Sequence, residues 1–128
     1  MKWMLLAGVG GFLGTCLRYW IGRLYQWAAP SATFPWGTFT VNILGSLLIG
    51  ILYGVVERHA PQNPVISALL ITGFCGGLTT FSSLSNDLYR LLDGEQAWLF
   101  ILYASLSFSL GLTMVWLGRL LVKGVIAA

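Results

Sequence analysis

A run of twenty residues without a charged side chain, residues 37–56, most restricts how this chain can fold. About twenty consecutive apolar residues, wound as a helix, span the hydrocarbon core of a bilayer. Backbone N–H and C=O groups meet no water in that core, so a spanning segment must satisfy them internally, as an α-helix does. The run therefore predicts a transmembrane helix over residues 37–56.

Three further apolar segments, about residues 3–25, 65–92 and 96–122, extend this prediction to the whole chain. Of the 128 residues, 57% are hydrophobic and 9% are charged, whereas soluble domains carry about a quarter charged residues. We predict an all-α membrane protein, a single four-helix transmembrane domain over residues 1–128, in the plasma membrane (the cell inner membrane). The N-terminus superficially resembles a signal sequence but lacks a small-residue cleavage site, so we expect it to be a retained span.

Positive charge is nearly balanced between the two ends of the predicted helices. Four helices joined by short loops place both termini on one side, with Lys2, Arg58, Arg119 and Lys123, and leave Arg18, Arg23 and Arg90 on the other. Such a small difference barely specifies an orientation in the membrane. The chain is therefore expected to insert both ways and to form an antiparallel, dual-topology homodimer, with any pathway between the subunits.

The third segment contains a stretch that a lipid-facing helix does not normally have. Residues 73–85 include three glycines and five hydroxyl side chains, with no charge. Adjacent glycines cost a helix interior roughly 2 kcal/mol relative to alanines, and hydroxyls compete for backbone carbonyls. We predict that the third helix breaks between Gly76 and Thr80. Broken backbone in a membrane must be buried in protein or line an aqueous path, although a packing seam of small residues is the alternative.

Polar residues at helical spacing mark the other segments. Asn42, the one strongly polar residue of the second segment, is either interhelical glue or a hydrogen-bond donor to an anion. Ser105, Ser109 and Thr113 recur four residues apart and share one face of the fourth helix, as packing glue or as a track of donors. Arg18 ends the uncharged part of the first segment, either as a snorkelling interfacial charge or as a vestibule cation.

Several classes of function are excluded by what the sequence lacks. It has no nucleophile elbow, zinc-protease motif, phosphate loop or pair of buried carboxylates, so we do not expect an enzyme. It has no basic cluster for nucleic acid, and Cys16 and Cys75 have no metal-site spacing. Amides, hydroxyls and aromatic ring edges at membrane depth suit an anion, but the oxygens could also serve a cation. A proton-coupled cation exporter would want an embedded acid.

Three motifs, taken in order and covering nearly the whole chain, resemble the fluoride channel family (CrcB/Fluc). They are Gly8-x-Gly10-Gly11-x-x-Gly14-x-x-x-Arg18, then Pro35-x-Gly37-Thr38-x-x-x-Asn42, and then the run from Thr72 to Ser82 that includes Gly76-Gly77-Leu78-Thr79-Thr80-Phe81. The resemblance implies an antiparallel homodimer with two fluoride pores along the subunit interface and no organic cofactor. Passive export through such pores would give fluoride resistance.

The resemblance also implies roles for individual residues. A structural sodium ion on the two-fold axis would be held by the backbone carbonyls of Gly76 and Thr79. Asn42 would be the pore amide, Phe81 would present its ring edge to fluoride, and Arg18 would lie near the vestibule. The remaining candidates for the pore lining are hydroxyls of the third and fourth helices, Ser82, Ser83, Ser85, Ser105, Ser109 and Thr113.

Leu84 departs from the family pattern. The family usually carries a second aromatic residue at this position, three residues after Phe81, and leucine has no ring edge to offer. We expect a pore that still forms, with Leu84 in its lining. Two other readings remain: a small dual-topology multidrug or cation exporter, for which the first segment lacks the embedded glutamate, and a structural membrane subunit.

Overall fold

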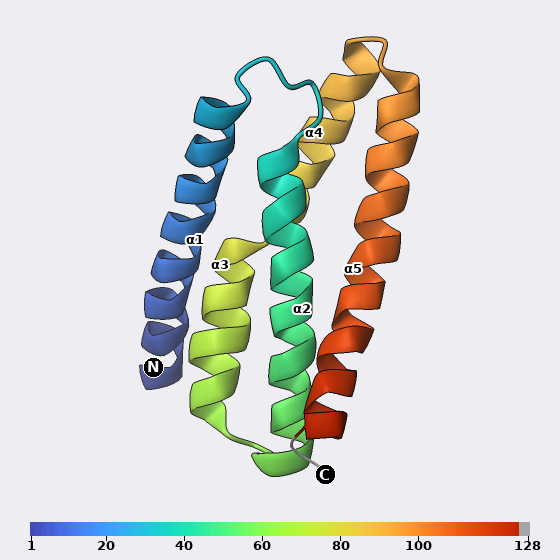
Figure 1. The fold of residues 1–128 in the computed structure, drawn as a ribbon. Helices are drawn as coiled ribbons and strands as arrows, with labels where there is room; N and C mark the ends of the chain where they lie inside the picture. The colour runs from blue at the N-terminus through green and yellow to red at the C-terminus, as the bar shows by residue number, and fades with distance from the viewer. Residues whose placement is uncertain (126–128) are drawn as a thin grey trace.

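The structure, a computed structural model, describes residues 1–125, and each span runs antiparallel to the one before it in the chain (Figure 1). In chain order they are α1 (Lys2–Ala28), α2 (Trp36–His59), η1 (Ile66–Cys75), α3 (Gly76–Leu78), α4 (Phe81–Asp93) and α5 (Ala97–Val125). No strand occurs in residues 1–125. The helices η1, α3 and α4 follow one another in one stretch, residues 66–93, which we call the third rod. Counted in this way, four stretches are long and apolar enough to cross a membrane. The prediction of an all-α chain with four spans is confirmed.

The helices pack as two close pairs, α1 with η1 and α3, and α2 with α5 (Figure 1). The first pair depends on glycines one turn apart in α1. A Cβ atom on Gly10 would lie 2.0 Å from the Leu69 carbonyl oxygen, and one on Gly14 would lie 2.1 Å from that of Phe74. No side chain fits there, so these glycines allow the backbones to touch, as small residues do between membrane helices.

Glycines likewise set the contact between α2 and α5. A Cβ atom on Gly50 would lie 2.2 Å from the Val115 carbonyl oxygen, and one on Gly118 would lie 2.5 Å from that of Leu47. Because lipid tails are as apolar as leucine, this close van der Waals contact replaces the hydrophobic effect as the source of helix association.

The third rod is interrupted at two threonines. Thr79 (φ −92°, ψ 153°) and Thr80 (φ −154°, ψ 125°) are both extended, and Thr80 Oγ1 then caps α4 by accepting from the Ser83 N–H at 3.3 Å. The interruption lies within the predicted range, but Gly76 and Gly77 remain helical. Gly77 serves packing instead, because its Cβ atom would lie 2.4 Å from the Gly11 carbonyl oxygen.

The interruption allows the third rod to change partners. Before it, η1 and α3 pack on α1; after it, α4 packs on α5. Leu84 and Leu91 of α4 are buried with Tyr103 of α5, and the rings of Phe34 and Phe39 pack against this cluster. Leu84 is only 7% exposed, so the residue that replaces the expected second aromatic is part of the core of the chain.

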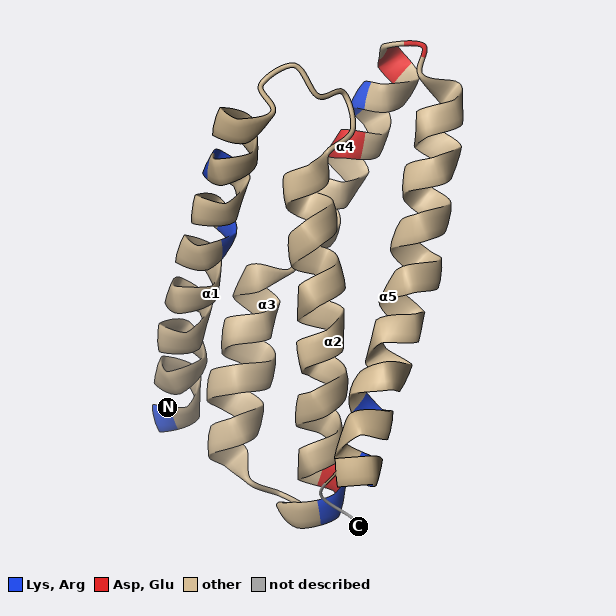
Figure 2. Cartoon of the chain, viewed as in Figure 1, with Lys and Arg blue, Asp and Glu red and all other residues tan. Residues whose placement is uncertain are grey.

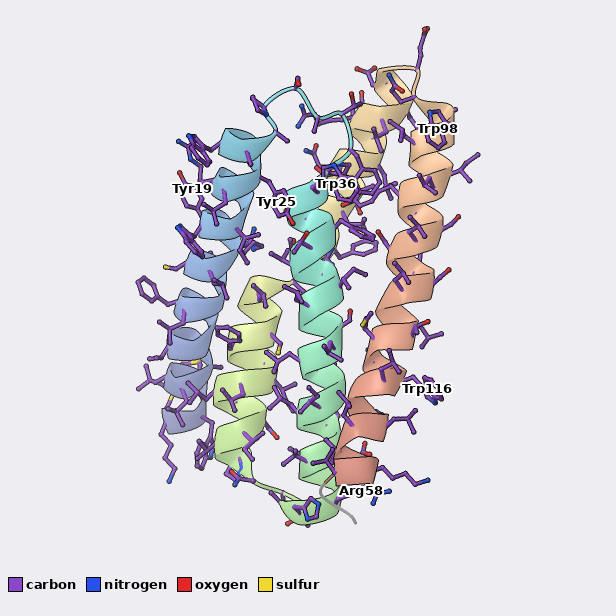
Figure 3. The ribbon with its side chains drawn as sticks, viewed as in Figure 1. Tyr19, Tyr25, Trp36, Arg58, Trp98 and Trp116 are labelled. Atoms are coloured by element: carbon purple, nitrogen blue, oxygen red, sulfur yellow. The ribbon has the colours of Figure 1, made fainter. Side chains whose placement is uncertain are left out.

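Two tryptophans on α5 indicate how the helices sit in a bilayer (Figure 3). Trp98 and Trp116 are five whole turns apart on one face, and they are 67% and 58% exposed. Their separation along the helix is about 27 Å, close to the ~30 Å thickness of the hydrocarbon core, and tryptophan favours both membrane surfaces. Ser107 lies halfway between them, which places it near the middle of the membrane.

Charged side chains agree with this placement. Figure 2 shows most lysine and arginine toward the two ends of the helices, with the N-terminus and the C-terminal end of α5 at the same end. Among the described residues one ion pair forms, between Arg119 of α5 and Glu57 of α2. Asp87 of α4 accepts a hydrogen bond from the Tyr103 hydroxyl at 3.1 Å.

Candidate ion pathway

Asn42 binds the interrupted backbone of the third rod. Its Oδ1 atom accepts the Thr80 N–H at 3.1 Å, a donor that an unbroken helix would direct to the Gly76 carbonyl. A backbone N–H can only donate, so the atom that faces it must be the amide oxygen. The Asn42 Nδ2 group therefore points away from Thr80 with both of its hydrogens available.

A cleft of about 360 Å³ lies beside this contact. Its lining includes Asn42, Thr80, Phe81, Leu84 and Ser107. Phe81 is 74% exposed, whereas the Ser107 Oγ atom is buried and has no hydrogen-bond partner within residues 1–125. An amide, an unpaired hydroxyl and an aromatic ring thus meet at the depth of Ser107, near the middle of the membrane.

Several other hydroxyls are occupied by their own helices. Ser46 donates to the Asn42 carbonyl at 2.7 Å, Thr79 to the Cys75 carbonyl at 2.9 Å, and Thr113 to the Ser109 carbonyl at 2.7 Å. Such bonds run back along the helix and leave the oxygen lone pairs, rather than the hydrogen, free. Ser107 differs from these residues because its hydrogen is uncommitted.

Ser105, Ser109 and Thr113 lie on the exposed face of α5, as do Trp98 and Trp116. They do not line the cleft beside Asn42. Their predicted role as a donor track stays a prediction, because within one chain they face outward.

The exposed side of α4 is also polar. Ser82 and Ser85 are exposed and Ser83 is half-buried, while the Ser82 hydroxyl lies 3.0 Å from that of Thr80. Asn86 continues the exposed face one turn after Ser82. Uncovered polar side chains are unfavourable in lipid, so this face calls for protein or water beside it.

Arg18 bends inward toward the break. Its Nε atom donates to the Gly77 carbonyl at 2.9 Å, and the side chain is partly buried. The interruption frees that carbonyl from its helical donor, and the guanidinium supplies a charged replacement. This bond turns the Arg18 side chain toward the third span within one chain, and its predicted place near the vestibule stays a prediction.

Two further clefts lead from Arg18 toward the end of the molecule that holds the α1–α2 loop. One of about 360 Å³ is lined by Arg18, Thr38 and Ser83, and a larger one of about 710 Å³ is lined by Thr38, Asp87 and Arg90. Thr38 lines both, so they adjoin. Charged side chains occur along this succession, Arg18 in the first cleft and Asp87 and Arg90 in the second.

The carbonyls of Gly76 and Thr79 suit a hard cation. The Thr80 N–H donates to Asn42, so the Gly76 carbonyl oxygen lacks the donor that a continuous helix would supply. The backbone at Thr79 is extended. Gly76 is exposed, with the Ile71 carbonyl 4.0 Å from its Cβ position. Hard cations bind carbonyl oxygens, and the sodium site predicted at Gly76 and Thr79 stays a prediction.

Ser107 is the residue of this site that the sequence analysis did not select. It lies on the side of α5 that faces α2, with Gly111 and Gly118. The sequence signal that could have identified Ser107 is the stripe of small residues at positions 107, 111 and 118. The Ser105–Ser109–Thr113 ladder is the more regular pattern, but it marks the opposite face.

Together, the fold and the site define a small multi-pass membrane protein with four spans, an interrupted third span and a cleft beside Asn42 at the interruption. Residues 5–119 match the family described as CrcB-like protein, Camphor Resistance (CrcB), and the chain belongs to this family.

Curated relatives match over nearly their full length. A fluoride-specific ion channel FluC of Flavobacterium psychrophilum is 42% identical over 96% of this chain and 98% of its own. One from Nitratidesulfovibrio vulgaris is also 42% identical, over 92% and 94%. One from Rhizobium meliloti is 39% identical, over 98% and 100%.

Proposed function

We propose that this chain is a fluoride-specific ion channel that lets fluoride leave the cell passively across the plasma membrane. The observation that carries the proposal is the Asn42 amide, whose oxygen is held by Thr80 N–H while its two N–H hydrogens stay available in a cleft at mid-depth. Family membership and the printed names of the relatives support the same function. A channel of this kind catalyses no covalent reaction.

Neutral donors suit fluoride for a physical reason. The ion is small and strongly hydrated, so a pore must replace its water with several donors that are too weak to trap it. The Asn42 Nδ2 group and the positive ring edge of Phe81 are such donors, and the Ser107 hydroxyl is an unpaired donor buried beside the same cleft. Leu84 contributes packing and no donor.

We infer an antiparallel homodimer from what one chain leaves uncovered. The extended backbone at Thr79 and Thr80 and the exposed hydroxyls Ser82 and Ser85 lie within the membrane span. Irregular backbone at that depth must be buried in protein or line a water-filled path. A second copy would cover these groups, and the near balance of basic residues between the ends favours insertion both ways.

In such a dimer the two pores would run along the subunit interface. The outward-facing Ser105, Ser109 and Thr113 would then line a pore. A sodium ion would be held between the subunits by the Gly76 and Thr79 carbonyls of each. It would satisfy oxygens that the break deprives of donors and would add fixed positive charge between the pores.

One observation favours a second candidate, a proton-coupled cation exporter. Asp87 is an acid within the third span, bonded to Tyr103 and lining the cleft of about 710 Å³. Tyr103 lies five positions from Trp98, so this carboxylate sits about 8 Å inside one membrane surface and away from the cleft at Asn42.

A liposome experiment separates the two candidates. Vesicles loaded with potassium fluoride and potassium chloride are given a potassium ionophore, and ion-selective electrodes follow both anions. The channel predicts fast fluoride efflux without a proton gradient, while chloride is retained. Transport of a cation that requires a proton gradient would favour the exporter, and no fluoride efflux from verified, assembled protein would refute the channel.

A further inference from the structure

We propose that the chain carries a binding site for the headgroup of an acidic phospholipid between the C-terminal ends of α2 and α5. The site is a cleft of about 190 Å³ at the end of the molecule that holds the N-terminus, far from the Asn42 cleft. Its lining includes Arg58 of α2 and Trp116 of α5, both labelled in Figure 3, together with Arg119 and Lys123 of α5. The proposal does not depend on what the channel conducts.

The depth of this cleft matches the lipid headgroups. Trp116 marks one membrane surface, as argued from its spacing to Trp98, and Lys123 lies two turns beyond it on the same face of α5. Leu120 lies between them and is exposed. An acyl chain can therefore run along Trp116 and Leu120 while its headgroup reaches the basic side chains. Basic pockets between spanning helices at this level bind acidic lipid headgroups.

The arginine at the centre of the cleft is held in place. Arg119 forms an ion pair with Glu57, and its guanidinium lies 5.6 Å from the centre of the Tyr53 ring. Both contacts come from α2, so they fix the guanidinium across the gap between the helices. Guanidinium offers five donors and retains some for a phosphate after pairing with one carboxylate.

The charge of the cleft favours a ligand with one negative charge. Three basic side chains and one acidic side chain, Glu57, line the cleft, which leaves a net charge of two positive charges. The C-terminal ends of α2 and α5 each carry a partial negative charge of roughly one half, and together they offset about one of these. The remainder is close to one positive charge. A phosphatidylglycerol headgroup carries one negative charge, whereas phosphatidylcholine carries none overall. Arg58 and Lys123 form no ion pair within residues 1–125 and are available to the phosphate.

Native mass spectrometry of the full chain in a neutral detergent tests the proposal, with dioleoyl phosphatidylglycerol and dioleoyl phosphatidylcholine as probes. We expect phosphatidylglycerol to bind at least tenfold more tightly. The double variant Arg58→Gln, Lys123→Gln should weaken it roughly 30-fold, since each basic residue at a membrane surface contributes about a fivefold attraction. The matched control Lys2→Gln, Arg23→Gln removes the same charge elsewhere and should change binding less than threefold.

A second variant changes affinity in the opposite direction. Glu57→Gln removes the competing carboxylate from Arg119 and should strengthen phosphatidylglycerol binding about fivefold. Equal binding of the two lipids, an equal loss in the control, or no gain in Glu57→Gln would overturn the proposal. Soluble glycerol phosphate that binds as tightly as the lipid would also overturn it, by showing a simple anion site. Fluoride flux is not a readout here, so this test and that of the channel can fail separately.

Discussion

Replacing Asn42 by aspartate separates the two functions that the structure combines in this side chain. The amide oxygen accepts the Thr80 N–H at 3.1 Å, and a carboxylate oxygen can accept the same hydrogen. The N–H₂ group that faces the cleft becomes a second oxygen. Asn42→Asp therefore keeps the bond that holds the break and converts a donor to fluoride into a negative charge.

The expected loss of flux is large. A fluoride ion about 4 Å from the carboxylate is repelled by roughly 4 kcal/mol at an effective dielectric constant of about 20. At about 1.4 kcal/mol per factor of ten, this repulsion alone slows passage about 1,000-fold. Loss of the donor adds to it, since a hydrogen bond to a charged group contributes about 1.5–3 kcal/mol.

Electrode-monitored fluoride efflux from liposomes gives the rate, and size-exclusion chromatography with thermal unfolding in detergent gives assembly and stability. Asn42→Ala is the control, because it leaves Thr80 N–H without a partner and should lower stability by about 1–3 kcal/mol, whereas Asn42→Asp should not. An assembled Asn42→Asp protein that conducts within tenfold of the unchanged protein would refute the reasoning, because Asn42 would then serve only to hold the helices.

Three further perturbations follow from the same contacts. Gly14→Ala places a methyl group 2.1 Å from the Phe74 carbonyl oxygen and should lower the free energy of unfolding by about 2 kcal/mol or more, as in overpacked cores. The control Gly8→Ala, whose methyl group meets nothing within 4 Å, should be neutral or slightly stabilising. Equal melting temperatures for the two variants would contradict the packing of α1. Ser107→Ala removes a buried, unpaired hydroxyl, so fluoride efflux should fall while the melting temperature holds or rises, and a fall in both would mean that the hydroxyl is structural. Exchange of sodium for N-methylglucamine should lower the melting temperature of the assembled protein, as expected if the Gly76 and Thr79 carbonyls bind the ion, and a melting temperature independent of sodium would count against that site.

Helix type and membrane placement followed from the sequence because they depend on local properties. Twenty uncharged residues require a helix in lipid, whatever the neighbours are. The GxxxG step from Gly10 to Gly14 likewise predicts a close approach, and the structure supplies the backbone of η1 as its partner. These inferences need only composition and spacing.

The position of the break was less predictable because tertiary contacts decide it. The sequence predicts a break between Gly76 and Thr80, and the chain leaves the helix within that range at Thr79 and Thr80, while Gly76 and Gly77 stay helical and Gly77 packs against α1. The N–H thereby released is accepted by Asn42, which is far away in sequence. Propensity gives the cost of glycine in a helix but not which helix will approach it.

Helical periodicity shows which residues of α5 share a face, but it does not show whether that face contacts lipid, water or protein. The Ser105–Ser109–Thr113 ladder is real, but within one chain it lies outward, and Ser107 on the other side meets Asn42. Leu84 shows the same limit, since the sequence marks it as a missing aromatic and the structure shows it packed with Leu91 and Tyr103. Which face meets lipid, water or a second copy depends on assembly, which no pattern in one chain encodes.

The sign and identity of the permeating ion are the most direct test, because amide and hydroxyl groups could serve either charge. In a planar bilayer with a tenfold gradient of potassium fluoride, a fluoride-selective pore gives a reversal potential of about 59 mV with the sign expected for an anion. We expect that value from this chain, and we expect it to stay unchanged when a chloride gradient is added. A reversal potential of the opposite sign, or one that follows chloride, would contradict the account.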